Sequence, residues 1–137
     1  SGRTSHGNGL VDSMGITATF LDALNVPPHQ SFKGRSAFGE GRIAVISENC
    51  GHGNADPAHR DVYFTITGST HKLMTVLKGT DLQITALYDL RTDPRELVNV
   101  HDRPEHAAAA QELIAYLKSE RAEIFALRNP SLPHAAE

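Results

Sequence analysis

The chain has 137 residues, of which 39% are hydrophobic and 21% charged, and its formal net charge is -3. This length predicts one domain or a portion of a larger protein. The nearly balanced charge gives no reason to expect binding to nucleic acid or to an anionic membrane. No apolar run approaches the roughly 20 residues of a membrane-spanning helix. The single cysteine, Cys50, excludes an internal disulfide framework and a cysteine-based zinc finger.

The first part of the chain predicts a short helix followed by a turn-rich connection. Residues 1–9 are polar and rich in glycine, as a linker or an exposed loop would be. Apolar residues recur at helical spacing over 13–24, with Asp12 or Ser13 as the candidate N-cap. A helix of about three turns with an apolar stripe is stable only when it packs on another part of the protein.

The middle of the chain predicts β-strands. Residues 42–48 (RIAVISE) are apolar enough for a covered strand, and 61–67 (DVYFTIT) are rich in β-branched and aromatic residues. After a turn at Gly68-Ser69, residues 70–77 form the expected antiparallel return strand. Residues 82–90 supply one or two further short strands.

A long amphipathic helix is predicted over 104–127, with Asp102 and Glu105 at the spacing of a capping box. The tail from 129 onward is expected to fray. The order of elements predicts an α+β fold, in which a small antiparallel sheet of about four strands packs against the long C-terminal helix.

A polar segment after the first strand is the candidate for chemistry, because a loop at a strand end can aim polar groups into a pocket. Glu48, His52, Asp56 and His59 are potential metal ligands, although their spacing is irregular. Cys50 beside His52 is a potential nucleophile and base. Two other interpretations remain for this segment: it binds an anionic ester, or it is a solvated loop without chemistry.

We expect most of the remaining ionisable residues to lie at the surface. Arginines lie near aspartates around the turns of 89–103, which indicates local charge balance. Six of the eight histidines fall in predicted loops or beside prolines or polar residues, and we expect them to be solvated: His6, His29, His59, His101, His106 and His134.

The string ALYDLRTDPRELVNV at 86–100 resembles the signature near the C-terminus of sulfatases, in the arylsulfatase branch of the alkaline phosphatase superfamily. Other segments follow the order of that family. The helix at 10–22 resembles the V-S-x-x-D-I-x-P-T-L-L-D helix, with Gly15 and Ala18 where Asp and Pro are usual. Gly34-Arg35-Ser36 resembles the D-G-R-S turn, and His71-Lys72-Leu73 resembles a strand reading Y-K-L.

This resemblance implies the C-terminal portion of a sulfate ester hydrolase. Residues 1–41 would end the catalytic domain and form a linker, 42–128 the C-terminal subdomain, and 129–137 a tail. The family's formylglycine arises in a C/S-x-P-x-R segment, and its calcium is held by Asp and Asn side chains upstream. Cys50 is followed by Gly51-His52-Gly53, so it does not match that segment. We therefore expect no catalytic residue, metal site or cofactor in this chain, which would be inactive alone.

The resemblance also implies pocket residues and partners. Glu48, Asn49, His52 and Lys72 become candidates for the substrate pocket. The expected partners are the N-terminal catalytic domain of the parent chain and a second copy of this chain, with no nucleic acid and no membrane. The alternatives are a parent that cleaves phosphate or phosphonate esters, and a non-catalytic binding or oligomerisation module. We expect a soluble protein, and the sequence leaves open whether it is cytoplasmic or periplasmic. In the signature, Leu87 and Leu90 are expected in the core and Tyr88 near the long helix.

Overall fold

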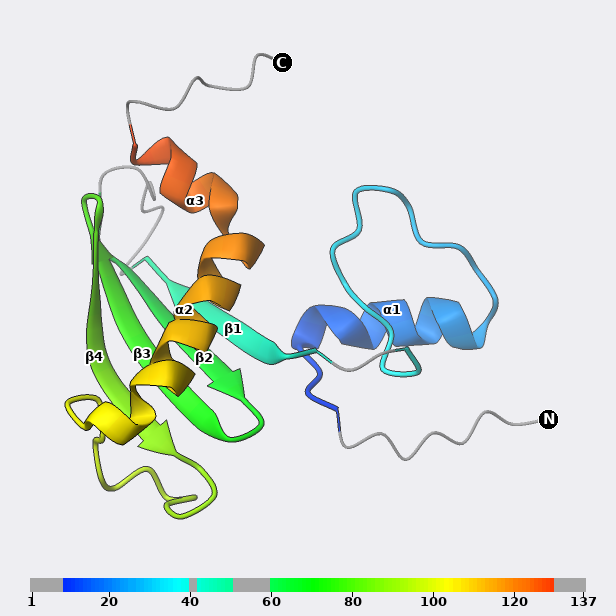
Figure 1. Ribbon diagram of the computed structural model, residues 1–137. Helices are drawn as coiled ribbons and strands as arrows, with labels where there is room; N and C mark the ends of the chain where they lie inside the picture. The colour runs from blue at the N-terminus through cyan, green and yellow to red at the C-terminus, as the bar shows by residue number, and fades with distance from the viewer. Residues whose placement is uncertain (1–8, 40–41, 51–59, 130–137) are drawn as a thin grey trace. The chain divides into compact units, whose positions relative to one another are not determined.

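The computed structural model describes residues 9–39, 42–50 and 60–129 (Figure 1). The chain divides into two compact units, Ser1–Val45 and Ile46–Glu137. Among the described residues, no helix is long and apolar enough to cross a membrane.

The first unit is built around helix α1 (Ser13–Ala23). Asp12 is its N-cap, and Asp12 Oδ1 accepts a hydrogen bond from the Gly15 amide at 2.7 Å, as the sequence predicts. Only Gly15 and Ala18 of this helix are buried. Its larger apolar residues are exposed instead, at 55% for Ile16 and 66% for Phe20. The described residues of this unit therefore leave the apolar stripe uncovered.

The buried side of α1 is covered by the segment that contains Gly34-Arg35-Ser36. Ser36 Oγ donates to Asp22 Oδ2 at 2.6 Å, and the amide of Ala37 donates to Thr19 Oγ1 at 2.9 Å. A Cβ atom at Gly34 would overlap the carbonyl oxygen of Met14, and one at Gly15 would lie 2.8 Å from the Arg35 carbonyl oxygen. Both glycines are therefore required by close backbone approach.

The second unit contains most of a four-stranded sheet in the order β1-β2-β3-β4, and the α+β prediction is confirmed. The strands are β1 (Ala44–Asn49), β2 (Val62–Gly68), β3 (His71–Lys78) and β4 (Asp81–Asp89). The pairs β2-β3 and β3-β4 are antiparallel. The segment at 82–90 forms one strand, not two.

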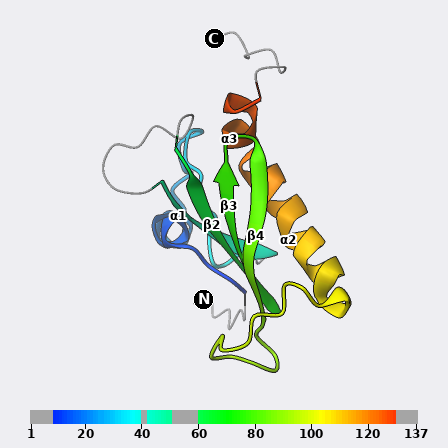
Figure 2. The ribbon, with the colours of Figure 1, turned by 90° about the vertical axis from the view of Figure 1, so that its left-hand side faces the viewer.

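Helices cover one face of this sheet (Figures 1 and 2). The predicted long helix is divided into a 3-10 turn η1 (Pro104–His106), α2 (Ala107–Glu120) and α3 (Ala122–Leu127). The division falls at Arg121, whose φ of -127° and ψ of 31° are not helical. Its guanidinium Nε donates to Glu48 Oε2 at 2.8 Å, a tertiary contact that helical periodicity cannot reveal.

The start of the helical segment also differs from the prediction. Arg103 is the N-cap of η1, and no side chain caps it, so the predicted capping box does not form. Asp102 instead pairs with His101 Nε2 at 3.0 Å. Pro104 does occupy the first turn, where its missing N–H costs nothing.

The core lies between the helices and the facing side of the sheet. Phe64 of β2 is 1% exposed and stacks on Phe125 of α3, with ring centroids 6.3 Å apart. Arg128, also buried, donates from Nη1 to the carbonyl oxygens of Leu77 at 2.9 Å and Gly79 at 3.0 Å. The C-terminal end of the helical layer is thereby bonded to the β3–β4 turn.

A β-bulge at Thr85 decides which side chains of β4 face the helices. Met74 pairs with Ala86 and Thr75 with Ile84, so Thr85 has no partner across the ladder. Such an extra residue inverts the alternation of the strand. Leu87 consequently lies opposite Leu73 on the helix-covered face and is fully buried. The predicted core position of Leu87 is confirmed, and Leu90 is half-buried.

The same bulge makes one sequence expectation wrong. Tyr88 lies opposite Lys72, on the face that points away from the helices, and does not pack near the long helix. Asn99 holds the bulge in place: its Oδ1 accepts from the Leu87 amide at 3.0 Å, and its Nδ2 donates to the Thr85 carbonyl oxygen at 3.3 Å.

Candidate functional site

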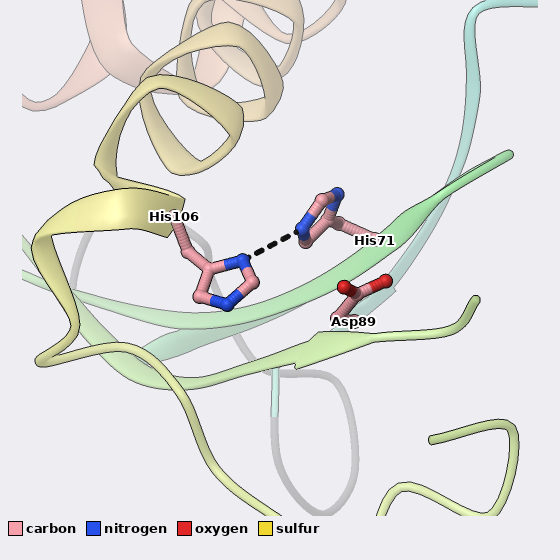
Figure 3. Close-up of side chains that lie close together, drawn as sticks. All are labelled: His71, Asp89 and His106. Carbon is pink, nitrogen blue, oxygen red and sulfur yellow. Dashed lines mark hydrogen bonds between the residues drawn. The ribbon is translucent and has the colours of Figure 1, made fainter. Parts of the chain in front are cut away.

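The edge of the sheet brings together three side chains from three elements: His71 of β3, Asp89 of β4 and His106 of η1 (Figure 3). His71 and Asp89 are direct cross-strand partners, and such neighbours have Cβ atoms about 5 Å apart. Because the bulge inverts the alternation of β4, Asp89 points to the helix-covered face, as His71 does. His106 reaches the pair from the first turn of the helical segment.

His71 and His106 are joined directly. His71 Nε2 lies 3.1 Å from His106 Nδ1, and the rings meet edge to face with centroids 5.3 Å apart. The other nitrogen of His71, Nδ1, lies 3.0 Å from Thr70 Oγ1. His71 is 7% exposed, and this burial is the main cause that lowers its pKa below the ordinary value. The buried imidazole is therefore held in its neutral form.

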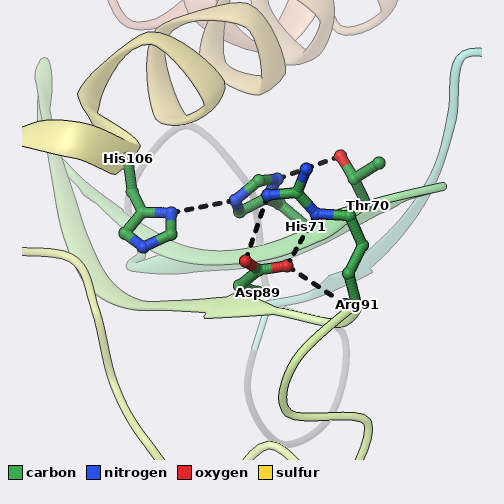
Figure 4. A network of polar contacts seen from close by, with 5 residues as sticks. All are labelled: Thr70, His71, Asp89, Arg91 and His106. Atoms are coloured by element: carbon green, nitrogen blue, oxygen red, sulfur yellow. Dashed lines mark hydrogen bonds and ion pairs between the residues drawn. The ribbon is translucent and has the colours of Figure 1, made fainter.

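Asp89, the cross-strand neighbour of His71, is bonded in turn by Arg91 (Figure 4). Its Oδ1 accepts from Nε of Arg91 at 3.0 Å and its Oδ2 from Nη2 at 3.1 Å, and the Arg91 amide also donates to Oδ1 at 3.0 Å. The hydrogen bonds from the Arg91 side chain are the largest cause that holds the pKa of Asp89 well below its usual range. Asp89 is thus a permanently ionised carboxylate at neutral pH, although it is only 6% exposed.

The cluster offers two imidazole nitrogens and one carboxylate oxygen, all within 4.8 Å of one another. This donor set is typical of sites for zinc and related cations and does not suit calcium, which prefers oxygen ligands. His106 is half-buried and bonded, so the expectation of a solvated histidine is wrong for this residue.

The residues predicted for a substrate pocket are not gathered in this cluster. The exposed Glu48, at the end of β1, pairs with Arg121 at 2.8 Å. Lys72 pairs with Glu96 at 2.8 Å and alternates with His71 along β3, so it faces away from the helices. Asn49 is exposed, and His52 lies outside the described residues. The structure therefore assigns Glu48 and Lys72 to different ion pairs.

The structure describes only part of the polar segment that follows β1. Cys50 is a half-buried free thiol. Asp56 and His59 lie outside the described residues, so the metal-site and nucleophile interpretations of this segment remain predictions.

Sequence reasoning missed the histidine pair for two physical reasons. His71 is the first residue of a strand, and only the register of the β3–β4 ladder places it opposite Asp89. His106 lies 35 positions further along the chain and reaches His71 through tertiary packing alone. The available signal was a histidine in the first turn of a helix that follows an antiparallel sheet, which is weak by itself.

Comparison with known proteins identifies solved structures with a similar fold. No family profile matches the chain, and no curated protein matches it significantly. Solved structures do match. The chain is similar in fold to part of solved sulfatases and of a phosphonate monoester hydrolase. The predicted resemblance to sulfatases is confirmed at the level of the fold.

Three of these structures show the extent of the match. A phosphonate monoester hydrolase of Agrobacterium radiobacter is 24% identical over 80% of this chain, with a TM-score of 0.60. A 2-O GAG sulfatase is 20% identical over 77% of this chain, with a TM-score of 0.59. A protein solved with its substrate D-glucosamine-2-N,6-O-disulfate is 21% identical over 80%, with a TM-score of 0.60. This chain spans only 23% to 24% of their lengths, which is consistent with a C-terminal portion.

Proposed function

We propose that this chain is the C-terminal portion of a sulfatase-like hydrolase that cleaves sulfate esters in the full-length protein. The observation that carries the proposal is the match of its fold to about a quarter of each of several such hydrolases. The signature string at 86–100 supports the proposal, because its polar side chains form hydrogen bonds that hold the local backbone. Asp93 Oδ2 accepts from the Val98 amide at 2.8 Å, and Asn99 bonds the bulge of β4.

The chain alone is proposed to be inactive. Its sequence has no C/S-x-P-x-R segment from which formylglycine could arise. Its histidine-rich cluster does not fit calcium, since two of the three donors are imidazole nitrogens. In this proposal the nucleophile and the calcium ligands belong to the N-terminal catalytic domain, and this chain contributes scaffold and one side of the pocket.

The exposed stripe of α1 supports the N-terminal catalytic domain as the partner. Ile16, Phe20 and Leu24 are 55%, 66% and 71% exposed and recur on one side of the helix. Contiguous exposed apolar side chains of this size usually mark a contact surface. We assign this stripe to contact with the catalytic domain, and a second copy of the chain is the competing occupant.

Glu48, Asn49, His52 and Lys72 remain the proposed pocket residues. A cation such as Lys72 would attract a sulfate group, and Glu96, which lies 2.8 Å from Lys72 Nζ, would position it. Comparison of Lys72→Met with Glu96→Gln in the full-length enzyme tests this role. Loss of turnover in Lys72→Met, with a smaller loss in Glu96→Gln at equal thermal stability, supports a substrate contact. Equal turnover in Lys72→Met and the parent enzyme contradicts it.

Two other functions are carried as alternatives. The match to a phosphonate monoester hydrolase supports a parent enzyme that cleaves phosphate or phosphonate esters. A non-catalytic binding or oligomerisation module is the other. Values of kcat/KM for an aryl sulfate and a phosphonate monoester, measured on the full-length protein, discriminate among them. Preference for the sulfate supports our proposal, preference for the phosphonate supports the first alternative, and no hydrolysis of either supports the module.

A further inference from the structure

We propose that His71, His106 and Asp89 form a binding site for a divalent transition-metal ion of the zinc class. The proposal is independent of the ester hydrolase function and concerns only residues of this chain. It places one ion where η1 meets the end of the β3–β4 ladder, at the hydrogen bond between His71 and His106.

The spacing of the donor atoms fits such an ion. Zinc binds imidazole nitrogen at 2.0–2.1 Å in a tetrahedral arrangement, so two ligand atoms on one ion lie about 3.3 Å apart. His71 Nε2 and His106 Nδ1 are 3.1 Å apart, close to that edge length. A carboxylate oxygen of Asp89 and one ring nitrogen of each histidine all lie within 4.8 Å of one another.

The groups around two of the three ligands, His71 and Asp89, also fit. A histidine that binds a metal commonly donates its second ring N–H to a neighbouring acceptor, which fixes the tautomer. His71 has that arrangement, since Nδ1 can donate to Thr70 Oγ1 at 3.0 Å and leave Nε2 as the lone-pair donor. Arg91 orients the carboxylate of Asp89 in the same way.

The charges of the site permit a cation. Without an ion, the two facing nitrogens must share one proton, because one donates and the other accepts. When a divalent cation binds, the hydrogen on His106 Nδ1 moves through water to His106 Nε2, so both imidazoles remain neutral ligands and the carboxylate of Asp89 supplies the negative charge. Arg91 opposes the cation, but its side chain is 60% exposed, so solvent screens its charge, whereas the side chain of Asp89 is 8% exposed.

The donor set selects among metals. Two imidazoles and one carboxylate suit zinc, cobalt or nickel, whereas calcium and magnesium prefer oxygen ligands alone. Three protein ligands leave a fourth coordination position for water. Binding should stabilise the fold, because the three ligands come from β3, β4 and η1 and come together only in the folded chain.

The test uses Zn²⁺ and Co²⁺ as probes on the 137-residue chain. Isothermal titration calorimetry should show one equivalent of Zn²⁺ bound and no binding of Ca²⁺. Thermal unfolding should show a rise in Tm when Zn²⁺ is added. His71→Ala and His106→Ala should each weaken Zn²⁺ affinity by about 100-fold or more, and Co²⁺ should lose its visible absorption bands. The matched control is His101→Ala, which removes a half-buried histidine that pairs with Asp102 outside the cluster.

Zn²⁺ affinity in His71→Ala or His106→Ala equal to that of the parent chain overturns the proposal, since the ion would then lie on other histidines. A parent chain that binds no Zn²⁺ also overturns it. If a variant fails to fold, NMR of the histidine side chains in the unsubstituted chain still tests the site. Zn²⁺ should shift the ¹⁵N resonances of His71 Nε2 and His106 Nδ1, and unshifted resonances in the presence of bound Zn²⁺ exclude the site.

Discussion

The strongest test of the fold is the substitution Leu87→Ala within the signature string. The Leu87 side chain is fully buried on the helix-covered face, opposite the equally buried Leu73. Its main-chain groups bond Asn99 Oδ1 and the Val100 amide, and these bonds do not need the side chain. The substitution therefore isolates the loss of packing.

Truncation of a fully buried leucine removes its transfer free energy and leaves a cavity, at a cost of about 3 to 5 kcal/mol. In a unit of this size that corresponds to a fall in Tm of more than about 10 °C. The matched control is Leu97→Ala, a leucine of the same string that is 75% exposed. Its cost should stay below about 0.5 kcal/mol.

Urea unfolding followed by far-UV circular dichroism measures both variants. The midpoint for Leu87→Ala should fall while the slope with denaturant stays unchanged, because the extent of unfolding is the same. Equal stability of Leu87→Ala and Leu97→Ala would refute the bulged register of β4, since that register alone turns Leu87 inward.

Three further substitutions test particular contacts. Arg128→Ala should lower the free energy of unfolding by about 2 kcal/mol or more, because the carbonyl oxygens of Arg60, Leu77 and Gly79 lose their guanidinium donor; thermal unfolding measures it. Asn99→Ala should cost about 1 to 2 kcal/mol, and Asn99→Asp less, since the aspartate keeps the acceptor for the Leu87 amide; urea unfolding compares them. Gly34→Ala should destabilise the Ser1–Val45 unit by about 1 to 3 kcal/mol, because its Cβ overlaps the Met14 carbonyl oxygen; loss of α1 helicity and faster proteolysis there report it.

Each of these has an outcome that contradicts it. Arg128→Ala with the Tm of the parent chain would show that the β3–β4 turn does not depend on the guanidinium. Asn99→Asp as costly as Asn99→Ala would place the main role in the amide donor to Thr85. Gly34→Ala without effect on the first unit would exclude the close approach of 34–36 to α1.

The elements that depend on local chemistry could be predicted from the sequence. Turn residues at Gly68-Ser69 and β-branched runs on either side predict the β2-β3 hairpin, and Asp12 predicts the start of α1. Features set by distant partners could not be predicted. At Arg121, where the long helix divides, the side chain bonds Glu48, which is 73 positions away.

The candidate site was missed for the same reason. The bulge at Thr85 is stabilised by Asn99, 14 positions later, and without it Asp89 would point away from His71. Alternation along an unbroken strand gives the opposite orientation for every residue beyond Thr85. The expectation for Tyr88 failed on this point, and the cluster of His71, Asp89 and His106 exists because of it.

The rate of aryl sulfate hydrolysis by the full-length protein, measured beside that of the 137-residue chain, tests the central proposal most directly. We expect calcium-dependent turnover by the full-length protein. We expect neither turnover nor stoichiometric calcium binding by the 137-residue chain, which has no C/S-x-P-x-R segment. Calcium-dependent hydrolysis by the 137-residue chain alone would contradict the proposed function, as would a folded full-length protein that hydrolyses no sulfate ester.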